Sequence, residues 1–480
     1  MIDTNLVLPF IAYFCILLAI GVISHTKQSS SAEFTVGNRS LNFWVTALSA
    51  HASDMSAWLF MAFPCAIFLG GLSQAWTAIG LLVGMWLNWQ FIAKKLRNAT
   101  EKYDTYTLSS FFEKRFKDNT HIVRIATALI AIFFLTSYVA AGLIAMGGIF
   151  ESIFGIDYYI GITVAALVML VYTFFGGFIT VAWTDLFQAL FLIAMIVLVP
   201  IVAFHTLPNG METIAQTAEQ KGISLSFMPD LSFESAMIAV FLILQWGLGY
   251  FGQPHILSKF MGINDPENMN KSKYLGMTWQ FVALSAAAFV GLVAIPYFAN
   301  GIDNPEHVFI YMVNSLFHPL AAGFILCGVL AASVSTMDSM ILVCATTISE
   351  DIYRNFFNKA ASQKQLVRMS RFGVFIVSII SLSLAIDKNT TIMEAVNYSW
   401  AGLGASFGPL MLFALYSKKV NNYGAIAGVV VGGTVAAVWS HINGYFTDIV
   451  IPQMIPGFLL SALSIYAVSA FTAQAKRDQV

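Results

Sequence analysis

The sequence predicts an all-α integral membrane protein with about thirteen transmembrane helices. Hydrophobic residues make up 58% of the 480 residues and charged residues only 10%, and the mean hydropathy is +0.75. A soluble fold of this length cannot bury so much apolar surface in its core, so the bilayer must be the main solvent. Apolar runs of about 20 residues, which cross a hydrocarbon core of roughly 30 Å, recur along the whole chain. No stretch remains for a separate soluble domain.

Apolar runs separated by polar breaks give the order of the expected helices. The first run, residues 6–23, is long enough to cross the membrane and is not followed by a small-residue cleavage site. It is therefore a retained helix and not a signal peptide. The expected helices begin near residues 6, 42, 73, 125, 157, 186, 234, 276, 307, 370, 394, 423 and 453.

The basic residues predict the orientation of these helices, because cytoplasmic loops of membrane proteins carry an excess of Lys and Arg. If the N-terminus lies outside, every Lys and Arg except Lys221 and Lys388 falls on the inner side. One helix missed or added would spoil this separation. The pattern therefore favours an odd number of helices, with the N-terminus outside and the C-terminus inside.

Two of the expected helices carry residues that interrupt a membrane helix. Unwound backbone inside a membrane is tolerated only where protein or a watery cavity satisfies its polar groups, so two broken helices indicate a shared central site. They are the second and the seventh helix, and this spacing fits two inverted five-helix repeats that each open with a discontinuous helix. The interrupting residues are Ser49, His51, Ser53, Asp54 and Ser56 in the second helix, and Gly247, Gly249, Gly252 and Pro254 in the seventh.

The repeats divide the chain into four parts. Residues 1–40 hold the first helix and a cytoplasmic loop, and residues 41–205 hold the first five-helix repeat. Residues 206–420 hold the second repeat, and residues 421–480 hold two C-terminal helices.

Several classes of function lack their signature in this sequence. The net charge of −1 gives no basic face for a nucleic acid. Residues 404–408 match the G-x-S-x-G pattern of hydrolase nucleophiles, but they lie inside an apolar helix, where the strand and sharp turn of that motif do not fit. The sequence contains neither HExxH nor a Walker A motif, and it has no filter-like segment of a channel. It predicts a transporter in a lipid bilayer and not an enzyme, and it gives no sign of an obligate protein partner.

Asp54 lies about halfway along the second helix, where a bare carboxylate costs a few kcal/mol or more. Such a residue needs a partner. One alternative is a structural hydrogen bond to the free N–H groups of the broken helix. The other, which we prefer, is a role in cation binding or coupling, because intramembrane carboxylates mark ion pathways.

A second oxygen-rich position lies in the ninth expected helix. Ala332, Ser335 and Thr336 are spaced at i, i+3 and i+4, so one carbonyl and two hydroxyls share a helix face. Alkali cations select oxygen ligands, and an unwound second helix adds the carbonyls of Ala52 and Met55. The alternative is that the two hydroxyls are packing groups between membrane helices.

Asp185 opens the sixth expected helix after a pair of glycines. It is either a helix cap or part of an ion pathway, and both alternatives remain open. Asp338 either extends the polar face of Ser335 or marks the cytoplasmic end of that helix.

Four aromatic residues belong to the helices expected around the central cavity: Trp58, Tyr138, Trp246 and Tyr250. Most membrane aromatics serve packing or anchor the interface. Trp246 and Tyr250, however, are four residues apart on the segment rich in Gly and Pro, where such rings suit the wall of a pocket.

Four segments give the chain a resemblance to the sodium:solute symporter family, and especially to its bacterial sodium/proline symporters. The resemblance runs from the first helix to the last. Ala57 and His51 depart from the family pattern, which has a glycine and a small residue at these positions. The segments are residues 47–56, 176–185, 246–255 and 330–336.

The resemblance implies a LeuT-type core of two inverted five-helix repeats, formed by the second to eleventh helices, with Na+ as the coupling ion. It assigns Asp54 and Asp185 to coupling and Arg39 to a cytoplasmic gate. The implied sodium ligands are the carbonyls of Ala52, Met55 and Ala332 and the hydroxyls of Ser335 and Thr336. The implied proline-binding residues are Ser56, Trp58, Tyr138, Trp246, Tyr250 and Pro254.

The expected function is sodium-coupled uptake of L-proline by alternating access at the inner membrane of a bacterium. One alternative is a sodium- or proton-coupled symporter of another small zwitterionic solute, in which Asp54 or His51 carries the proton. Another is a transporter-like sensor, but only three residues follow Arg477, so we expect no output domain.

Overall fold

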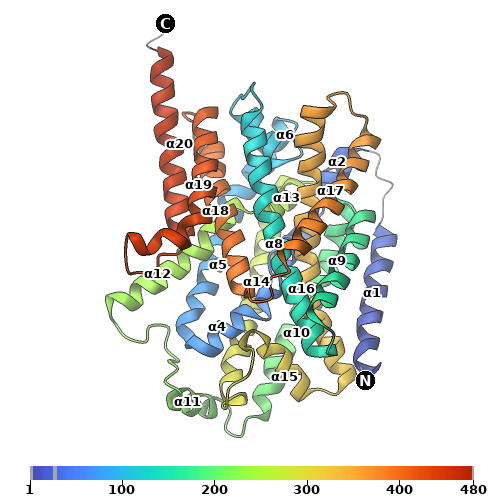
Figure 1. Cartoon of the computed structure of the whole chain (residues 1–480), viewed down its shortest axis with the longest axis vertical. Coiled ribbons are helices and arrows are strands. Elements are labelled where there is room, and N and C mark those ends of the chain that lie inside the picture. Colours follow the sequence, from blue (N-terminus) through green and yellow to red (C-terminus); the bar gives the residue numbers. More distant parts are fainter. Residues whose placement is uncertain (1–3, 25–29, 478–480) are drawn as a thin grey trace.

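The computed structural model describes residues 4–24 and 30–477, and within them the regular structure is helical apart from one isolated bridge between Leu41 and Ile263. Most of the long helices run along the long axis of the molecule (Figure 1). Nine helices in the described residues are long and apolar enough to cross a membrane. The all-helical membrane fold is therefore confirmed, and the number of thirteen helices stays a prediction. Lys27, which the orientation argument places inside, lies outside the described residues.

The described residues of the first half of the chain form ten α-helices. They are α1 (Thr4–Ser24), α2 (Ser31–Val36), α3 (Phe43–Ala52), α4 (Ala62–Gly70), α5 (Trp76–Leu87), α6 (Lys94–Lys102), α7 (Leu108–Arg115), α8 (Ile122–Phe154), α9 (Tyr158–Phe175) and α10 (Phe178–Thr206).

The second half contains ten more. They are α11 (Met211–Gln220), α12 (Phe233–Gly247), α13 (Pro254–Met261), α14 (Met269–Tyr297), α15 (Val308–Leu316), α16 (Pro319–Thr346), α17 (Gln363–Leu384), α18 (Ile392–Tyr416), α19 (Asn422–Ile442) and α20 (Met454–Arg477).

Both predicted interruptions are confirmed. Helix α3 ends at Ala52, and residues 53–56 are not helical before a short 3-10 turn leads into α4. Helix α12 ends at Gly247, and a 3-10 segment with an extended Gln253 leads into α13, whose first residue is Pro254. Proline fits this first position because it has no N–H to leave unpaired.

Glycine is required in the second interruption because another helix comes close. A Cβ atom on Gly249 would lie 2.0 Å from the indole nitrogen of Trp400, and one on Gly252 would lie 2.6 Å from the carbonyl oxygen of Leu403. Helix α18 therefore packs directly against the backbone of the interrupted segment.

Four of the predicted helices begin or divide differently in the structure. Helices α14 and α17 begin at Met269 and Gln363, seven residues before the expected starts near 276 and 370. Helix α10 begins at Phe178, eight residues before the expected start near 186. The helix expected from residue 307 is divided into α15 and α16, and α16 begins at Pro319, where a helix with a prolyl first residue starts anew.

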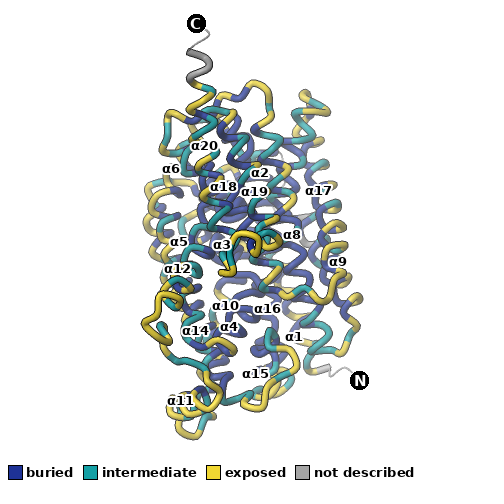
Figure 2. Tube along the Cα trace, turned by 60° about the vertical axis from the view of Figure 1, so that its left-hand side comes forward, coloured by how far each residue is buried: buried dark blue, intermediate teal, exposed yellow. Residues whose placement is uncertain are grey.

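The centre of the molecule is formed by α8 and α16. The most apolar window of the span containing α16 is 83% buried and that of α8 is 72% buried, against 33% for each of the spans containing α19 and α20. Helices α19 and α20 lie together at one edge (Figure 1), and exposed residues gather at both ends of the molecule (Figure 2). The interrupted helices therefore enclose a site that lies deep in the protein.

Candidate functional site

The interrupted α3 and the unbroken α16 meet at a group of four oxygen atoms. The Ser335 hydroxyl lies 2.8 Å from the Ala52 carbonyl oxygen and 3.2 Å from that of Ala332. The Thr336 hydroxyl lies 3.5 Å and 3.1 Å from the same two oxygens. The carbonyl of Ala52 is free of a helical partner because α3 ends there. Four of the five predicted sodium ligands are thus together, and Met55 lies three residues further along the unwound segment.

This group of oxygens fits a small hard cation. Each hydroxyl donates its hydrogen to a carbonyl in this arrangement, and rotation of the hydroxyls would turn their lone pairs and the freed carbonyls toward an ion. Ser335 is fully buried and Thr336 is 2% exposed, so water does not compete for these oxygens.

Asp54 is paired with a side chain of the other interrupted segment. Its carboxylate accepts a hydrogen bond from the hydroxyl of Tyr250, which in turn accepts one from the Gln280 side-chain amide at 2.9 Å. All three residues are buried. The carboxylate therefore links the two interruptions directly.

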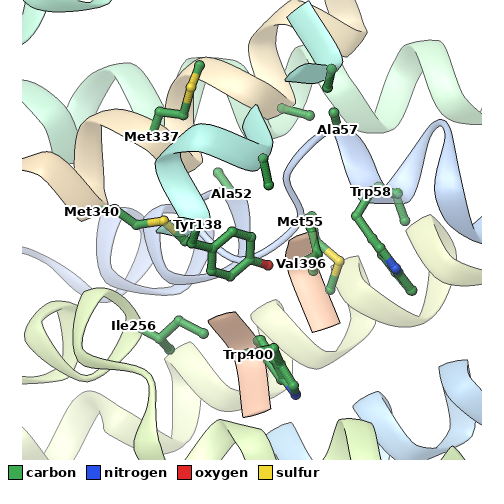
Figure 3. Packing of buried hydrophobic residues seen from close by; sticks show 14 of the residues in the cluster. Ala52, Met55, Ala57, Trp58, Tyr138, Ile256, Met337, Met340, Val396 and Trp400 are labelled. Carbon is green, nitrogen blue, oxygen red and sulfur yellow. The ribbon is translucent and has the colours of Figure 1, made fainter. Parts of the chain in front are cut away.

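A small cavity lies beside this pair, with a volume of about 10 Å³. Figure 3 shows Met55 and Trp58 on the unwound segment, with Tyr138 of α8 and Trp400 of α18 beside them. The ring centroids of Trp58 and Trp246 are 4.8 Å apart, and those of Tyr250 and Trp400 are 5.1 Å apart. The residues around the cavity are Asp54, Met55, Trp58, Leu81, Tyr138, Trp246, Tyr250 and Trp400.

Two of the predicted solute-binding residues, Ser56 and Pro254, do not line this cavity. Pro254 lines a second cavity of about 30 Å³, together with Lys259, Ser339 and residues of the loop before α7. Ser56 caps the short helical turn of the unwound segment by accepting a hydrogen bond from the Trp58 N–H at 3.2 Å. The structure thus brings Trp58, Tyr138, Trp246 and Tyr250 together, but not Pro254.

Asp185 lies seven residues inside α10 and not at its start, so it does not cap this helix. Its Oδ2 atom lies 2.9 Å from the ammonium of Lys259 on α13, 2.7 Å from the Ser49 hydroxyl and 3.4 Å from the Ser339 hydroxyl. It therefore joins four helices in the protein interior. Asp338 is also fully buried, which excludes a solvated helix end.

Arg39 lies in the turn between α2 and α3. One of its Nη atoms donates to the Thr105 carbonyl at 3.2 Å, and the other lies 4.0 Å from Glu101. Its guanidinium stacks over the ring of Tyr106 at 5.8 Å. Arg39 thus connects the start of the first interrupted helix to the loop that follows α6.

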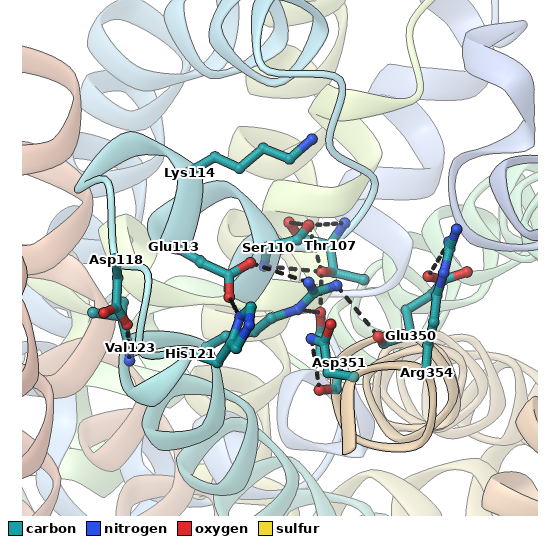
Figure 4. A network of polar contacts seen from close by, with 12 residues as sticks. Thr107, Ser110, Glu113, Lys114, Asp118, His121, Val123, Glu350, Asp351 and Arg354 are labelled. Atoms are coloured by element: carbon teal, nitrogen blue, oxygen red, sulfur yellow. Dashed lines mark hydrogen bonds and ion pairs between the residues drawn. The ribbon is translucent and has the colours of Figure 1, made fainter. Parts of the chain in front are cut away.

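A buried network of charges closes the same end of the molecule, where Glu113 of α7 lies near His121 and Asp351 (Figure 4). The Arg124 guanidinium lies 2.7 Å from Asp351 and 3.1 Å from Glu113. The Thr107 hydroxyl donates to Asp351 at 2.8 Å. This network connects the short helix α7 to the start of α8 and to the π-helix Thr347–Phe357, which continues α16.

Sequence reasoning missed Trp400, Gln280 and the role of Lys259. Trp400 donates its indole N–H to the Trp246 carbonyl at 3.2 Å, and an aromatic residue in an apolar helix carries no signal of this. Lys259 gave no signal either, because a basic residue near a helix end is ordinarily solvated, whereas this side chain is only 1% exposed.

The family model of the sodium:solute symporter family matches residues 34–432 of this chain. The chain is 40% identical to the high-affinity proline transporter PutP of Bacillus subtilis (strain 168), over 96% of this chain and 98% of that protein. It is 39% identical to a sodium/proline symporter of Staphylococcus aureus (strain JH9), over 96% of this chain and 91% of that protein.

Solved structures show the same fold. A Na+-coupled sialic acid symporter, solved in a substrate-bound outward-open state, has a TM-score of 0.82 at 17% identity and covers 98% of both chains. MhsT in complex with L-phenylalanine has a TM-score of 0.53 at 15% identity, covering 88% of this chain and 97% of that one. The fold is therefore the LeuT-type arrangement of two inverted repeats. With a family model that covers most of its length and relatives that match it nearly from end to end, the chain belongs to the sodium:solute symporter family.

Proposed function

We propose that this protein takes up L-proline together with Na+ across the cytoplasmic membrane of a bacterium. The observation that carries the proposal is the meeting of carbonyl and hydroxyl oxygens from Ala52, Ala332, Ser335 and Thr336. The named activities of the two bacterial relatives support proline as the solute.

In this proposal the sodium ion is bound by the carbonyls of Ala52, Met55 and Ala332 and the hydroxyls of Ser335 and Thr336. When the ion binds, the hydroxyl-to-carbonyl hydrogen bonds break, and the hydroxyl and carbonyl oxygens bind the ion instead. It holds α16 against the end of α3 and orders the unwound segment between Ala52 and Ser56. Because the ion enters with the membrane potential, each charge contributes about 2.3 kcal/mol per 100 mV.

The solute binds in the cavity that Trp58, Tyr138, Trp246 and Tyr250 line. A volume of about 10 Å³ holds roughly one water molecule, so the rings must separate to admit a solute. Asp54 couples the two sites, because it lies two residues after Ala52 and its carboxylate accepts the hydrogen bond of Tyr250. Sodium that orders the unwound segment thereby sets the position of a pocket residue, which is coupling by differential affinity.

The remaining assignments follow from this arrangement. The first repeat covers residues 41–205 and the second covers residues 206–420, with the N-terminus outside and the C-terminus inside. Arg39 and Asp185 belong to the cytoplasmic closure of the pathway. The N-terminal end of α1 and the C-terminal end of α20 lie at opposite ends of the molecule (Figure 1), which supports an odd number of membrane crossings.

Uptake of radiolabelled proline into proteoliposomes tests the proposal when sodium and pH gradients are imposed separately. We expect accumulation with the sodium gradient alone and none with the proton gradient alone. Accumulation driven by pH would overturn sodium coupling. Competition by other small zwitterionic amino acids at lower concentrations than proline would overturn the choice of solute.

A further inference from the structure

A buried charged centre lies next to the proposed sodium site and has no role in it. The Lys259 ammonium lies 2.9 Å from the Asp185 carboxylate, and their side chains are 1% and 0% exposed. The hydroxyls of Ser49 and Ser339 lie 2.7 Å and 3.4 Å from the same carboxylate oxygen. Helices α3, α10, α13 and α16 therefore meet at one oxygen atom.

The centre lies one helical turn from the sodium site, on the same two helices. Ser49 precedes Ala52 by three residues on α3, and Ser339 follows Thr336 by three residues on α16, which is about one turn on each helix. The cavity of about 30 Å³ that reaches Lys259 and Ser339 also includes Tyr106 and Thr107 of the loop before α7. The centre thus lies on the side of the sodium site that faces this loop.

The shell of the centre without the lysine is made of oxygen. It consists of a carboxylate and two hydroxyls, which is a ligand set that suits an alkali cation. The other carboxylate oxygen of Asp185 has no hydrogen-bond partner among the described residues. Asp338, next to Ser339, is fully buried, and neither of its carboxylate oxygens has a partner in that part of the chain.

The charges of the centre explain why a cation must be present. Asp185 is paired with the Lys259 ammonium, and a second buried carboxylate, that of Asp338, interacts electrostatically with both groups. A buried carboxylate that loses its partner inside a membrane protein costs several kcal/mol. Removal of the ammonium alone would leave a strongly attractive, oxygen-lined position for a cation.

We propose that the Lys259 ammonium is a built-in cation that fills a second cation site of this symporter, so that only the ion at Ser335 and Thr336 is transported with the solute. The lysine sets the number of sodium ions per solute without moving across the membrane. The inference rests on the proposed sodium site. It is tested by the sodium-to-proline ratio, whereas that site is tested by the sodium dependence of the Ser335 and Thr336 variants.

The test is the ratio of radiolabelled sodium to radiolabelled proline that enters proteoliposomes containing Lys259→Met. We expect one more sodium ion per proline than in the unmodified protein, together with a steeper dependence of uptake on sodium concentration. Lys259→Arg keeps the charge and should keep the original ratio. The double variant Lys259→Met with Asp185→Asn also lacks the carboxylate charge, so we expect its sodium-to-proline ratio to return to that of the unmodified protein.

Lys273→Met is the matched control. Lys273 is also a buried lysine, at 5% exposure, but its ammonium lies 2.8 Å from the neutral amide oxygen of Gln90. Its removal leaves no carboxylate unpaired, so the ratio should stay as it is.

A ratio in Lys259→Met equal to that of the unmodified protein would overturn the inference and leave the ion pair as a structural contact. If Lys259→Met transports too slowly for the sodium-to-proline ratio to be measured, thermal unfolding in detergent tests whether sodium binds at the second site. Sodium should then raise the melting temperature of Lys259→Met more than that of the double variant, and an equal rise in both would contradict the second site. Failure of the Ser335 and Thr336 variants to change sodium dependence would instead remove the first site, whatever Lys259→Met shows.

Discussion

The hydroxyl of Tyr250 donates a hydrogen bond to the carboxylate of Asp54, and these residues come from the two different interrupted helices. Asp54 follows the end of α3 by two residues, and Tyr250 lies in the 3-10 segment after α12. One hydrogen bond therefore connects the opening helices of the two repeats. It also connects the oxygen group around Ala52 to the aromatic cavity.

The first prediction concerns this hydrogen bond. Asp54→Asn loses the negative charge but keeps one acceptor oxygen, so we expect it to need far more sodium while still showing sodium-driven uptake at saturating salt. Tyr250→Phe keeps the ring but leaves the carboxylate with one donor fewer, and it should weaken proline binding and sodium binding together. Titration of uptake with sodium and with proline measures both. Full uptake by Asp54→Asn at low sodium would mean that this carboxylate serves only the fold.

The second prediction concerns the hydroxyls of the proposed sodium site. Ser335→Ala and Thr336→Ala each remove one ligand and should raise the sodium concentration for half-maximal uptake by about tenfold, or roughly 1.4 kcal/mol. Ser333→Ala is the control, because this hydroxyl is equally buried on α16 but bonds only to the Val329 carbonyl at 2.9 Å. Unchanged sodium dependence in the first two variants would make their hydroxyls packing groups between helices.

The third prediction separates the aromatic cavity from the ion. Trp246→Ala and Trp400→Phe change the walls of the cavity, so we expect them to weaken proline binding more than sodium binding. Trp279→Phe is the control, because this buried indole donates to the Ala189 carbonyl at 3.0 Å and does not line the cavity. Isothermal binding measurements on purified protein report the two affinities separately. A loss of sodium binding with intact proline affinity would place the solute elsewhere.

The fourth prediction concerns stability at the end of the molecule that holds α7. Arg124 lies between Glu113 and Asp351, whose side chains are 8% and 0% exposed. Arg124→Ala leaves two buried carboxylates without their cation and should destabilise the fold by roughly 3–5 kcal/mol. Arg354→Ala removes an ion pair in which the arginine is 43% exposed, and such a pair contributes at most about 1 kcal/mol. Chemical unfolding in detergent compares the two variants, and similar losses would show that the buried network does not stabilise α7.

The fifth prediction concerns orientation. In a background without the four native cysteines, a cysteine in place of Lys221 should react with a membrane-impermeant maleimide from outside the cell. Cysteines in place of Lys102 and Lys364 should react only after the membrane is opened. All three positions are exposed in the structure, so accessibility depends on the side of the membrane. The reverse labelling pattern would invert the topology.

Local patterns were the part of the site that the sequence could reveal. The spacing of Ala332, Ser335 and Thr336 places them on one face of any helix, and the polar residues around Asp54 mark an interruption wherever the segment lies. The early start of α10 had a local cause as well. Thr180, Thr184 and Asp185 are polar but buried in the protein, and Asp185 was taken for the opening of this helix.

Partners across the fold could not be predicted in this way. Lys259 and Asp185 are separated by 74 residues, and Trp400 reaches the carbonyl of Trp246 across 154 residues. Such pairs depend on how the two repeats lie against each other, which hydropathy does not encode. Lys259 in particular has the sequence context of a cytoplasmic loop lysine, and only the packing of α3, α10 and α16 around α13 removes it from water.

The tight aromatic cavity has a consequence for energy conservation. When a carrier returns from the inward-open to the outward-open state without solute, it must not contain a continuous water-filled path for ions. Such a leak would dissipate the gradient on which accumulation depends. The ring pairs Trp58–Trp246 and Tyr250–Trp400 have centroids about 5 Å apart, and the cavity between these residues, about 10 Å³, holds roughly one water molecule. In the proposed function, the closed cavity therefore insulates the two aqueous phases from each other, and its rings separate only when the solute binds.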